Sequence, residues 1–334
     1  MAREQAKFKL TDDGLHVTDS ILWLDSATNG QLSFLSTALK KTQICVPQVI
    51  TTEETAKLLE VLKKKPNALV CQYNRPFSLG KLRIELLPSG NILGGASLLI
   101  ETDRDKILYA PFLQPNAIPT VRKMQIKRAH SLIVGAYFPD SNTVFPNRKR
   151  EKERLVEKVQ AFIANDEYPI IMCDPSSTAQ EVLKLLCDNG FPVSVHPSIR
   201  RINKVYENYG TKLGRYSVFT KRNSLNKKVL ILPKSIILPF SGVKLPSSPI
   251  LSIDDALQTG TNLRGFFATM PTRIADTFFL SSYCDGPELR AVISLVSPKE
   301  LYFIGPYAKK YCEDFQNAAQ KVQPLYVNDQ PTLF

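Results

Sequence analysis

Histidine is scarce in this sequence. Among 334 residues there are only three, His16, His130 and His196, and they lie far apart in the chain. Zinc sites in proteins use histidine and cysteine side chains at short sequence spacings. The sequence therefore offers no local histidine motif for a metal, and we interpret each histidine as a structural or surface residue.

Paired cysteines and long apolar runs are absent as well. The six cysteines have no Cys-x-x-Cys spacing and are predicted to be reduced core thiols. They are Cys45, Cys71, Cys173, Cys187, Cys284 and Cys312. No stretch is long and apolar enough for a transmembrane span, and residues 1–7 are charged without an apolar segment behind them. We therefore expect no membrane association and no secretion, and we predict a cytoplasmic protein.

The charge of the chain is strongly positive. Forty-three Lys and Arg residues against 31 Asp and Glu residues give a formal net charge of +12. A basic excess of this size favours a polyanionic partner such as nucleic acid over an acidic protein surface. The length allows two domains, and the hydrophobic content of 43% is sufficient for packed cores.

The hydrophobic pattern predicts a β-rich first part. Residues 8–25 alternate apolar and polar around a turn at residues 12–14, which indicates a hairpin. A helix capped by Thr51 or Thr52 is predicted to end before Pro66. Further strands are predicted at residues 81–87, 97–101, 106–110 and 131–137.

After residue 139 the pattern changes to alternating β and α elements. These are a helix at 150–164, a strand at 168–173, a helix that starts at Asp174-Pro-Ser-Ser-Thr178 and ends at Asn189-Gly190, and a strand at 192–196. Such alternation predicts a parallel sheet covered by helices. From residue 265 the chain is predicted to return to the first domain. The elements expected there are strands at 266–270, 277–281 and 301–304, a helix after Gly286-Pro287, and a last helix to about residue 322.

Five segments carry a resemblance to a known family. They are Leu22-Trp-Leu-Asp-Ser26, residues 32–42, Ile50-Thr-Thr-Glu-Glu-Thr55, Leu86-Leu-Pro-Ser-Gly-Asn-Ile-Leu-Gly-Gly-Ala96 and Val195-His-Pro-Ser-Ile-Arg-Arg-Ile-Asn-Lys-Val-Tyr206. In this order they resemble metallo-β-lactamase fold nucleases of the β-CASP branch, and most of all the DNA exonucleases associated with a ligase and a helicase. The resemblance implies an α/β fold in which residues 1–142 and 265–334 form a metallo-β-lactamase-like αββα sandwich. Residues 143–264 would then form an inserted β-CASP-like, Rossmann-type lobe.

The family's metal-binding motifs are not kept in this sequence. Its first motif, Ser-His-x-His-x-Asp-His, places imidazoles and a carboxylate on one loop and so helps to hold two zinc ions. Other residues stand at the positions that the resemblance assigns to metal ligands or catalytic side chains, namely Thr37, Leu39, Lys41, Thr42, Asn91, Pro111, Gly135, Tyr283 and Gly305. The resemblance therefore implies a member without metal, cofactor or catalysis. Lys41 would repel a divalent cation; it is either a solvated lysine or a holder of phosphate.

The strongest positive signal is the segment of residues 200–228. It contains nine basic residues and one acid, Glu207, and aromatic residues are interleaved with the charges. Basic side chains neutralise phosphates, and aromatic rings stack on unpaired bases. The predicted nucleic-acid-binding residues are Arg200, Arg201, Lys204, Tyr206, Tyr209, Lys212, Arg215, Tyr216, Lys221 and Arg222. The alternative is a solvated surface with buried aromatic side chains. The segment Asp174-Pro-Ser-Ser-Thr178 is predicted to be either a phosphate site at a helix start or an ordinary helix N-cap.

The sequence thus predicts a non-catalytic relative of nucleases that binds DNA or RNA and serves a protein partner such as an active paralogue, a ligase or a helicase. One alternative is an enzyme with a relocated active site that uses Asp25, Asp285, Tyr283 or Lys41, although no acid–base or nucleophile constellation is visible. The other alternative is a purely protein-binding scaffold subunit, which exposed apolar side chains would support.

Overall fold

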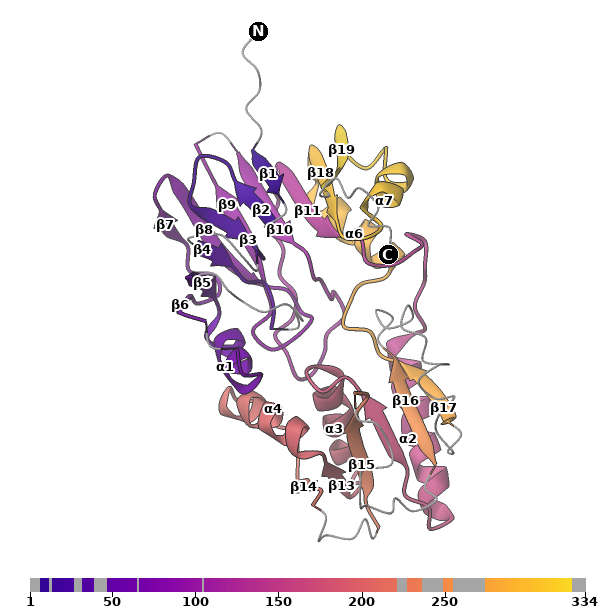
Figure 1. Ribbon diagram of the computed structural model, residues 1–334. Helices are drawn as coiled ribbons and strands as arrows, with labels where there is room; N and C mark the ends of the chain where they lie inside the picture. The colour runs from indigo at the N-terminus through magenta and orange to yellow at the C-terminus, as the bar shows by residue number, and fades with distance from the viewer. Residues whose placement is uncertain are drawn as a thin grey trace, which may run out of the picture. The chain divides into compact units, whose positions relative to one another are not determined.

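The computed structural model divides the chain into two compact units (Figure 1). It describes residues 7–11, 14–26, 32–38, 47–64, 66–103, 105–220, 227–235, 249–254 and 274–325. Of these, the first unit contains the residues within Met1–Ala117, Val121–Thr143 and Cys284–Phe334, and the second contains those within Ile118–Thr120 and Val144–Tyr283. The described residues form three sheets and six α-helices, so the protein is of the mixed α/β class.

The first sheet lies in the first unit and follows the chain order. Its strands are β1 (Phe8–Thr11), β2 (Gly14–Val17), β3 (Leu22–Leu24), β4 (Leu32–Phe34), β5 (Gln48–Thr51) and β6 (Ala68–Val70). Strands β1 to β3 are antiparallel, and β3 to β6 are parallel. Helix α1 (Glu53–Val61) follows β5 and is capped by the Thr52 side chain, which accepts a hydrogen bond from the Thr55 amide, as predicted. The turn predicted at residues 12–14 falls mostly outside the described residues.

The second sheet of the first unit has seven strands. In spatial order these are β19 (Lys321–Leu325), β18 (Glu300–Ile304), β11 (Ser131–Gly135), β10 (Lys106–Ala110), β9 (Ala96–Glu101), β8 (Leu82–Pro88) and β7 (Phe77–Leu79). Helices α6 (Gly286–Val296) and α7 (Ala308–Asp314) belong to the same unit. The prediction that the last helix reaches residue 322 is wrong. Helix α7 ends at Asp314, and β19 then pairs in parallel with β18, so a long-range ladder overrides the local pattern.

Alternating side chains of the second sheet pack into two different hydrophobic cores. Ile84 and Leu86 of β8 join a cluster that includes Leu22 and Phe34 of the first sheet. Leu87, one residue further on, points to the other face and joins a cluster with side chains of α6 and α7. The two sheets therefore pack face to face, and two helices cover the outer face of the second sheet.

The third sheet makes up the second unit and is entirely parallel. Its spatial order is β14 (Ser217–Val218), β13 (Val193–Val195), β15 (Val229–Pro233), β12 (Ile170–Cys173), β16 (Ile250–Asp254) and β17 (Ile274–Phe279). Three helices connect or flank these strands, α2 (Arg148–Ala164), α3 (Thr178–Asp188) and α4 (Pro197–Asn208). The parallel arrangement agrees with the alternating β and α pattern of the sequence.

The predicted domain boundary at residue 265 differs from the structure. Strand β17 covers residues that were expected in the first domain, but it pairs with β16 in the third sheet, and the second unit continues to Tyr283. The strand predicted at residues 266–270 lies outside the described residues. Periodicity identifies a strand, whereas its sheet is decided by hydrogen bonds to distant residues.

A buried ion-pair cluster joins helices α2 and α3. The carboxylate of Glu181 contacts Arg148 and Lys152, with a distance of 2.6 Å from Lys152 Nζ to Glu181 Oε1. Burial alone would raise the pKa of Glu181, but the two cations hold it below its ordinary value. The pair also reaches β17, because Arg148 Nη1 donates to the carbonyl of Ser281 directly after that strand.

Candidate nucleic-acid interface

Helix α4 carries the centre of the predicted basic segment. The His196 side chain caps the helix by accepting from the Ser198 amide at 3.1 Å, and Pro197 occupies the first helical turn. The inward face consists of Ile199, Ile202, Asn203, Val205 and Tyr206, which are all buried. The helical period therefore directs Arg200, Arg201 and Lys204 toward solvent, where Arg200 is half-buried and the other two are exposed.

Helices α4 and α2 differ in how their cations are paired among the described residues. Among the described residues, Arg200, Arg201 and Lys204 have no ion-pair partner. In contrast, Arg148 and Lys152 of helix α2 are held by Glu181, and Arg154 is held by Glu151 and Asp276. The uncompensated charge on α4 is available to a ligand, whereas that of α2 is largely used within the fold.

Two of the aromatic residues are core residues rather than stacking surfaces. Tyr206 is 0% exposed and donates its hydroxyl to the carbonyl of Ser176 at 3.0 Å. Phe219 is buried as well. The prediction that Tyr206 stacks on a base is therefore wrong for this structure, because the helical spacing that exposes Arg200 and Lys204 turns position 206 inward.

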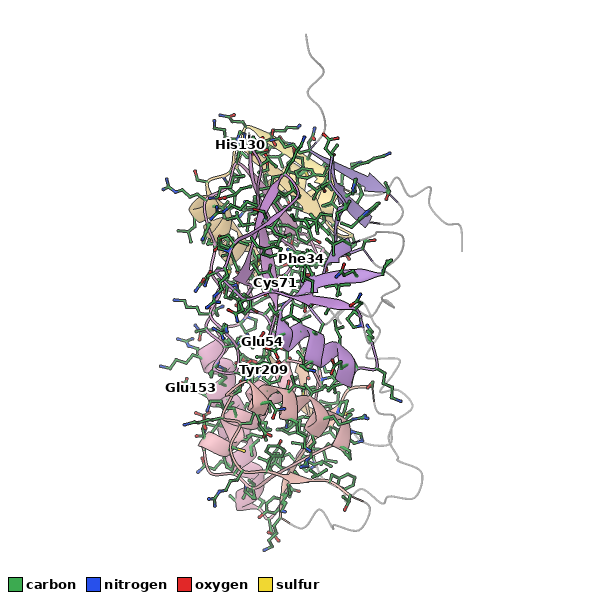
Figure 2. The ribbon with its side chains drawn as sticks, turned by 90° about the vertical axis from the view of Figure 1, so that its left-hand side faces the viewer. Phe34, Glu54, Cys71, His130, Glu153 and Tyr209 are labelled. Atoms are coloured by element: carbon green, nitrogen blue, oxygen red, sulfur yellow. The ribbon has the colours of Figure 1, made fainter. Side chains whose placement is uncertain are left out.

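Tyr209 and Tyr216 are the partly exposed rings of the segment. Tyr209 is the C-cap residue of α4 and is labelled in Figure 2. The Tyr216 hydroxyl donates a hydrogen bond to Glu207 Oε1 at 2.8 Å. The only acidic residue of the segment is therefore engaged by Tyr216. Burial and this hydrogen bond raise the pKa of Tyr216 to about 12, so the ring is neutral at physiological pH. A neutral, half-buried ring beside free cations is suited to stacking on a base.

The remaining predicted residues continue the basic surface after the helix. Lys212 and Arg215 are exposed and have no ion-pair partner in the described part of the chain. Lys227 lies 3.4 Å from Asp166, and Lys228 donates to Ser217 at 3.0 Å, so these two are engaged locally. Lys221 and Arg222 lie outside the described residues.

The positions assigned to metal ligands are distributed over both units. Thr37, Asn91, Pro111 and Gly305 belong to the first unit, and Tyr283 belongs to the second. Leu39, Lys41 and Thr42 fall outside the residues that the structure describes. Asn91 is fully buried, and its Oδ1 accepts from the Ser89 hydroxyl at 2.8 Å. Asn91 is thus part of the packing of its own loop.

An aromatic ring fills the space beside Gly135 at the end of β11. An ideal Cβ on Gly135 would lie 2.1 Å from Tyr137 Cε2 and 2.4 Å from the carbonyl oxygen of Pro111. The ring of Tyr137 stacks on Phe112, with centroids 5.1 Å apart and planes at 9°. It also lies beside Gly305, whose ideal Cβ would be 3.2 Å from Tyr137 Cδ1. Sequence reasoning did not identify this role of Tyr137, although glycine at a ligand position is a signal for a close approach.

The donor set does not fit a metal pair. Within the described ranges there is no group of three or more His, Cys, Asp or Glu side chains that could hold a metal ion. The three histidines are also separate. His16 contacts the Ser20 carbonyl at 2.7 Å, His130 lies 3.5 Å from Asp105, and His196 caps α4. Zinc needs several such donors converging on one point, so no chemical step through a metal is assigned to these residues.

The residues of the alternative active site have structural partners. The carboxylate of Asp25 accepts from the Ser36 amide at 3.0 Å and from the Tyr109 hydroxyl at 2.9 Å. Asp285 and Glu288 form a capping box at the start of α6. Lys41 lies outside the described residues, and Tyr283 is buried. The contacts of Asp25 and Asp285 show that both carboxylates take part in the packing of the fold.

The Asp174-Pro-Ser-Ser-Thr178 turn is likewise closed by its own contacts. Asp174 Oδ1 accepts from the Ser176 amide at 2.8 Å, and the Ser177 hydroxyl lies 3.0 Å from that of Ser282. Ser177 and Thr178 are buried at the start of α3. The turn therefore resembles a packed helix start more than an open phosphate site.

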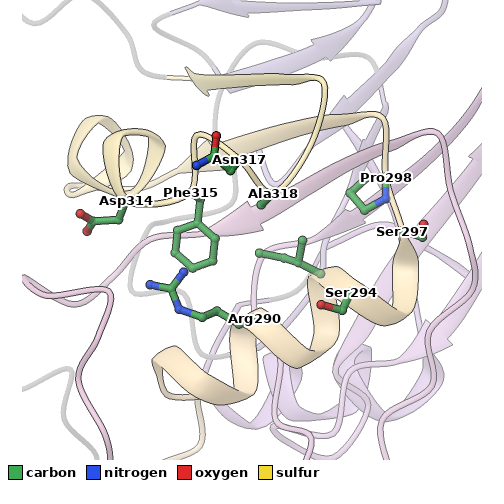
Figure 3. Close-up of a pocket in the computed structure, with 9 residues that line it drawn as sticks. Arg290, Ser294, Ser297, Pro298, Asp314, Phe315, Asn317 and Ala318 are labelled. Atoms are coloured by element: carbon green, nitrogen blue, oxygen red, sulfur yellow. The ribbon is translucent and has the colours of Figure 1, made fainter.

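A pocket of about 460 Å³ lies between α6 and the turn after α7 (Figure 3). Its floor contains Ile293 and Phe315, and the guanidinium carbon of Arg290 lies 4.2 Å from the Phe315 centroid. Arg290 also donates to Asn142 Oδ1 at 2.7 Å. The neighbouring Leu295 on α6 is 64% exposed. The lining of the pocket mixes apolar residues with charged and polar ones such as Arg290, Ser294 and Asp314.

The sequence is similar, at low identity, to two proteins that carry names. No family model matches it. It is 22% identical over 304 residues to a "Probable DNA ligase" of Opitutus terrae, a match that covers 90% of this chain and 29% of the relative. It is 23% identical over 255 residues to an "RNase J-like protein" of Methanocaldococcus jannaschii, covering 73% of this chain and 54% of the relative. The chain therefore spans less than a third of one relative and about half of the other.

A solved structure shares the fold. The structure of a protein of unknown function from Enterococcus faecalis V583 matches with a TM-score of 0.65 and 14% identity, over 89% of this chain and 79% of that chain. The two named relatives carry a ligase name and a nuclease-like name. No described helix is long and apolar enough to cross a membrane.

Proposed function

We propose that this protein binds nucleic acid without cleaving it. In this proposal its first unit is a metallo-β-lactamase-like sandwich, and its second unit is a β-CASP-like lobe. The observation that carries the proposal is the uncompensated basic face of helix α4, with Arg200, Arg201 and Lys204 beside the partly exposed Tyr209 and Tyr216. Cations of this kind contact phosphates, and the two rings offer faces to unpaired bases.

The absence of catalysis in this proposal is supported by the space around β11. The Tyr137 ring occupies the volume that a side chain on Gly135 would need, and Asn91 is buried in its own loop. The names of the distant relatives agree with a nucleic-acid ligand. A non-catalytic protein of this type would act as a subunit or regulator beside an active nuclease, a ligase or a helicase.

The proposal predicts a specific change in salt dependence. Each lost phosphate contact lowers the slope of log affinity against log salt by about 0.7 to 0.9. Replacing Arg200, Arg201 and Lys204 by Glu should therefore weaken binding to single-stranded oligonucleotides and reduce the slope by about two to three units. Fluorescence anisotropy over a salt series, with DNA and RNA of the same sequence, measures both quantities and compares the two polymers.

A matched variant separates local contacts from net charge. Replacing Lys149, Arg150 and Lys184 by Glu changes the charge of the same unit equally, but on helices α2 and α3. This control should keep the slope of the parent. If both triple variants bind as the parent does, α4 is not the nucleic-acid interface.

A protein-binding scaffold is the second candidate function. The pocket at α6 and the exposed Leu295 favour it, since a partner's apolar side chain would find a floor of Ile293 and Phe315 there. In that case binding to nucleic acid would be weak for the parent protein and for all variants alike.

A further inference from the structure

A second basic surface lies in the first unit, in a stretch without acidic residues. No Asp or Glu occurs between Asp105 and Asp140. Within this stretch, residues 122–128 connect β10 to β11 and contain Arg122, Lys123, Lys127 and Arg128, all of which are exposed. We name these residues the 122–128 strip. Its composition gives it a local positive potential that the flanking chain does not offset.

The backbone of the strip is fixed to the body of the first unit. The Gln125 amide donates to the Pro88 carbonyl at 2.9 Å. Met124 and Ile126 pack against the core below α6 and α7. Met124 also approaches Gly90 so closely that an ideal Cβ on Gly90 would lie 3.0 Å from Met124 Cβ. Because the backbone is already fixed, little backbone conformational entropy is lost when the exposed cations bind a ligand.

Arg122 is oriented by an aromatic ring. Its guanidinium carbon lies 5.5 Å from the centroid of Tyr73, and the Tyr73 hydroxyl donates to the Gly95 carbonyl at 2.9 Å. A guanidinium held over a ring keeps its N–H edge available for a phosphate. Glu54 is near enough to influence the pKa of Tyr73, but it makes no ion pair with Arg122 among the described contacts.

Most of the strip's charge is uncompensated. Lys127 is paired with Glu85, at 2.7 Å from Nζ to Oε1. Arg122, Lys123 and Arg128 have no ion-pair partner in the part of the chain that the structure describes. Three free cations on a fixed segment form a surface for a ligand that carries several negative charges.

We propose that the 122–128 strip binds the phosphate backbone of nucleic acid as a second contact surface of this protein. The inference rests on the proposed nucleic-acid binding and adds a surface to the first unit. Tyr73, the ring beside the strip, has its hydroxyl and one face engaged within the fold. The strip therefore contacts phosphates without stacking on bases, and its contribution is the same for single-stranded and double-stranded polymers.

The test replaces Arg122, Lys123 and Arg128 by Glu, and in a parallel variant by Gln. Binding of the full chain to labelled single-stranded and double-stranded DNA oligonucleotides is measured over a salt series. We expect both variants to lower the slope of log affinity against log salt by about two to three units. The affinity for single-stranded and for double-stranded DNA should fall in both variants. Inorganic polyphosphate should displace DNA less effectively from the variants than from the parent protein.

A control variant in the same unit makes the result specific. Lys9, Lys299 and Lys309 are exposed and unpaired among the described residues, so their replacement by Glu changes the charge of the first unit equally. This control should keep the parent slope. Circular dichroism and the melting temperature confirm that all variants are folded.

Three outcomes would contradict the inference in distinguishable ways. If the strip variants bind as the Lys9, Lys299 and Lys309 control does, while the α4 variant loses slope, the strip is not a contact surface and the proposed function remains. If the strip variants lose affinity with an unchanged slope of log affinity against log salt, their effect is not on phosphate contacts. If the parent itself binds no oligonucleotide, the proposed function fails together with the inference.

Discussion

Gly135 and Tyr137 show how one side chain can depend on the absence of another. Gly135 ends strand β11, and the Tyr137 ring occupies the space directly above its Cα. The ring is supported from the other side by stacking on Phe112. Any side chain at position 135 would collide with the Tyr137 ring and with the carbonyl oxygen of Pro111. The glycine and the tyrosine therefore depend on each other.

At this scale we predict that Gly135→Ala is destabilising. The new methyl group would overlap Tyr137 and the carbonyl of Pro111, and overpacking of this kind costs about 1 to 3 kcal/mol in the free energy of unfolding. Urea unfolding of the parent and the variant measures the difference. In a double-mutant cycle, adding Tyr137→Ala should recover part of the loss because the ring is one of the two obstacles. If Gly135→Ala leaves the free energy of unfolding unchanged, the Tyr137 ring is not held against Gly135.

Helix α4 shows how an element can join stability to ligand binding. Its cap, His196, is partly buried and lies near Arg201, one of the proposed phosphate contacts. Burial and the charge of Arg201 lower the pKa of His196, so the folded protein favours the neutral ring. Only the neutral ring can accept the hydrogen bond from the Ser198 amide.

We therefore predict a pH-dependent contribution of His196 to stability. The folded state binds a proton less readily than the unfolded chain, so the contribution is complete above the unfolded pKa of about 6.5. It is lost progressively as the pH falls below that value toward the lowered folded pKa. His196→Asn keeps an acceptor at the cap and should remove this part of the pH dependence between pH 5 and 7. Denaturant midpoints of both proteins across this range provide the measurement, and parallel curves would contradict the prediction.

At the scale of the whole molecule, the proposed contact surfaces lie on two separately packed units. The first unit contains the two face-to-face sheets, the aromatic filling at Tyr137 and the 122–128 strip. The second unit contains the parallel sheet and helix α4. Each unit carries exposed cations of its own, on helix α4 in the second unit and on the 122–128 strip in the first.

At this scale we predict that metal does not contribute to folding. A metal bound only by the folded state would stabilise it by mass action, and chelator would remove that stabilisation. The purified protein should therefore melt at the same temperature with and without EDTA, and elemental analysis should find no stoichiometric zinc, manganese or iron. One or two tightly held metal ions per chain, with a lower melting temperature after chelation, would contradict this prediction.

Features that depend on neighbouring residues could be predicted from the sequence. The cap at Thr52, the alternating strands and helices of the second unit, and the concentration of charge in residues 200–228 all follow from local spacing. Local patterns work here because hydrogen-bonded caps and amphipathic faces involve residues within a few positions of one another.

Tertiary structure alone decided the features that depend on distant residues. The pairing of β17 with β16, the strand at β19 and the filling of the space at Gly135 are set by partners far away in the chain or by a ring that folds back. Tyr206 is the clearest case, since its place in a basic segment suggested a surface ring. Its position on the inward face of α4, against Ser176 of another element, made it part of the core instead. Burial is a property of the packed chain, and sequence spacing indicates it only where the packing partner is already known.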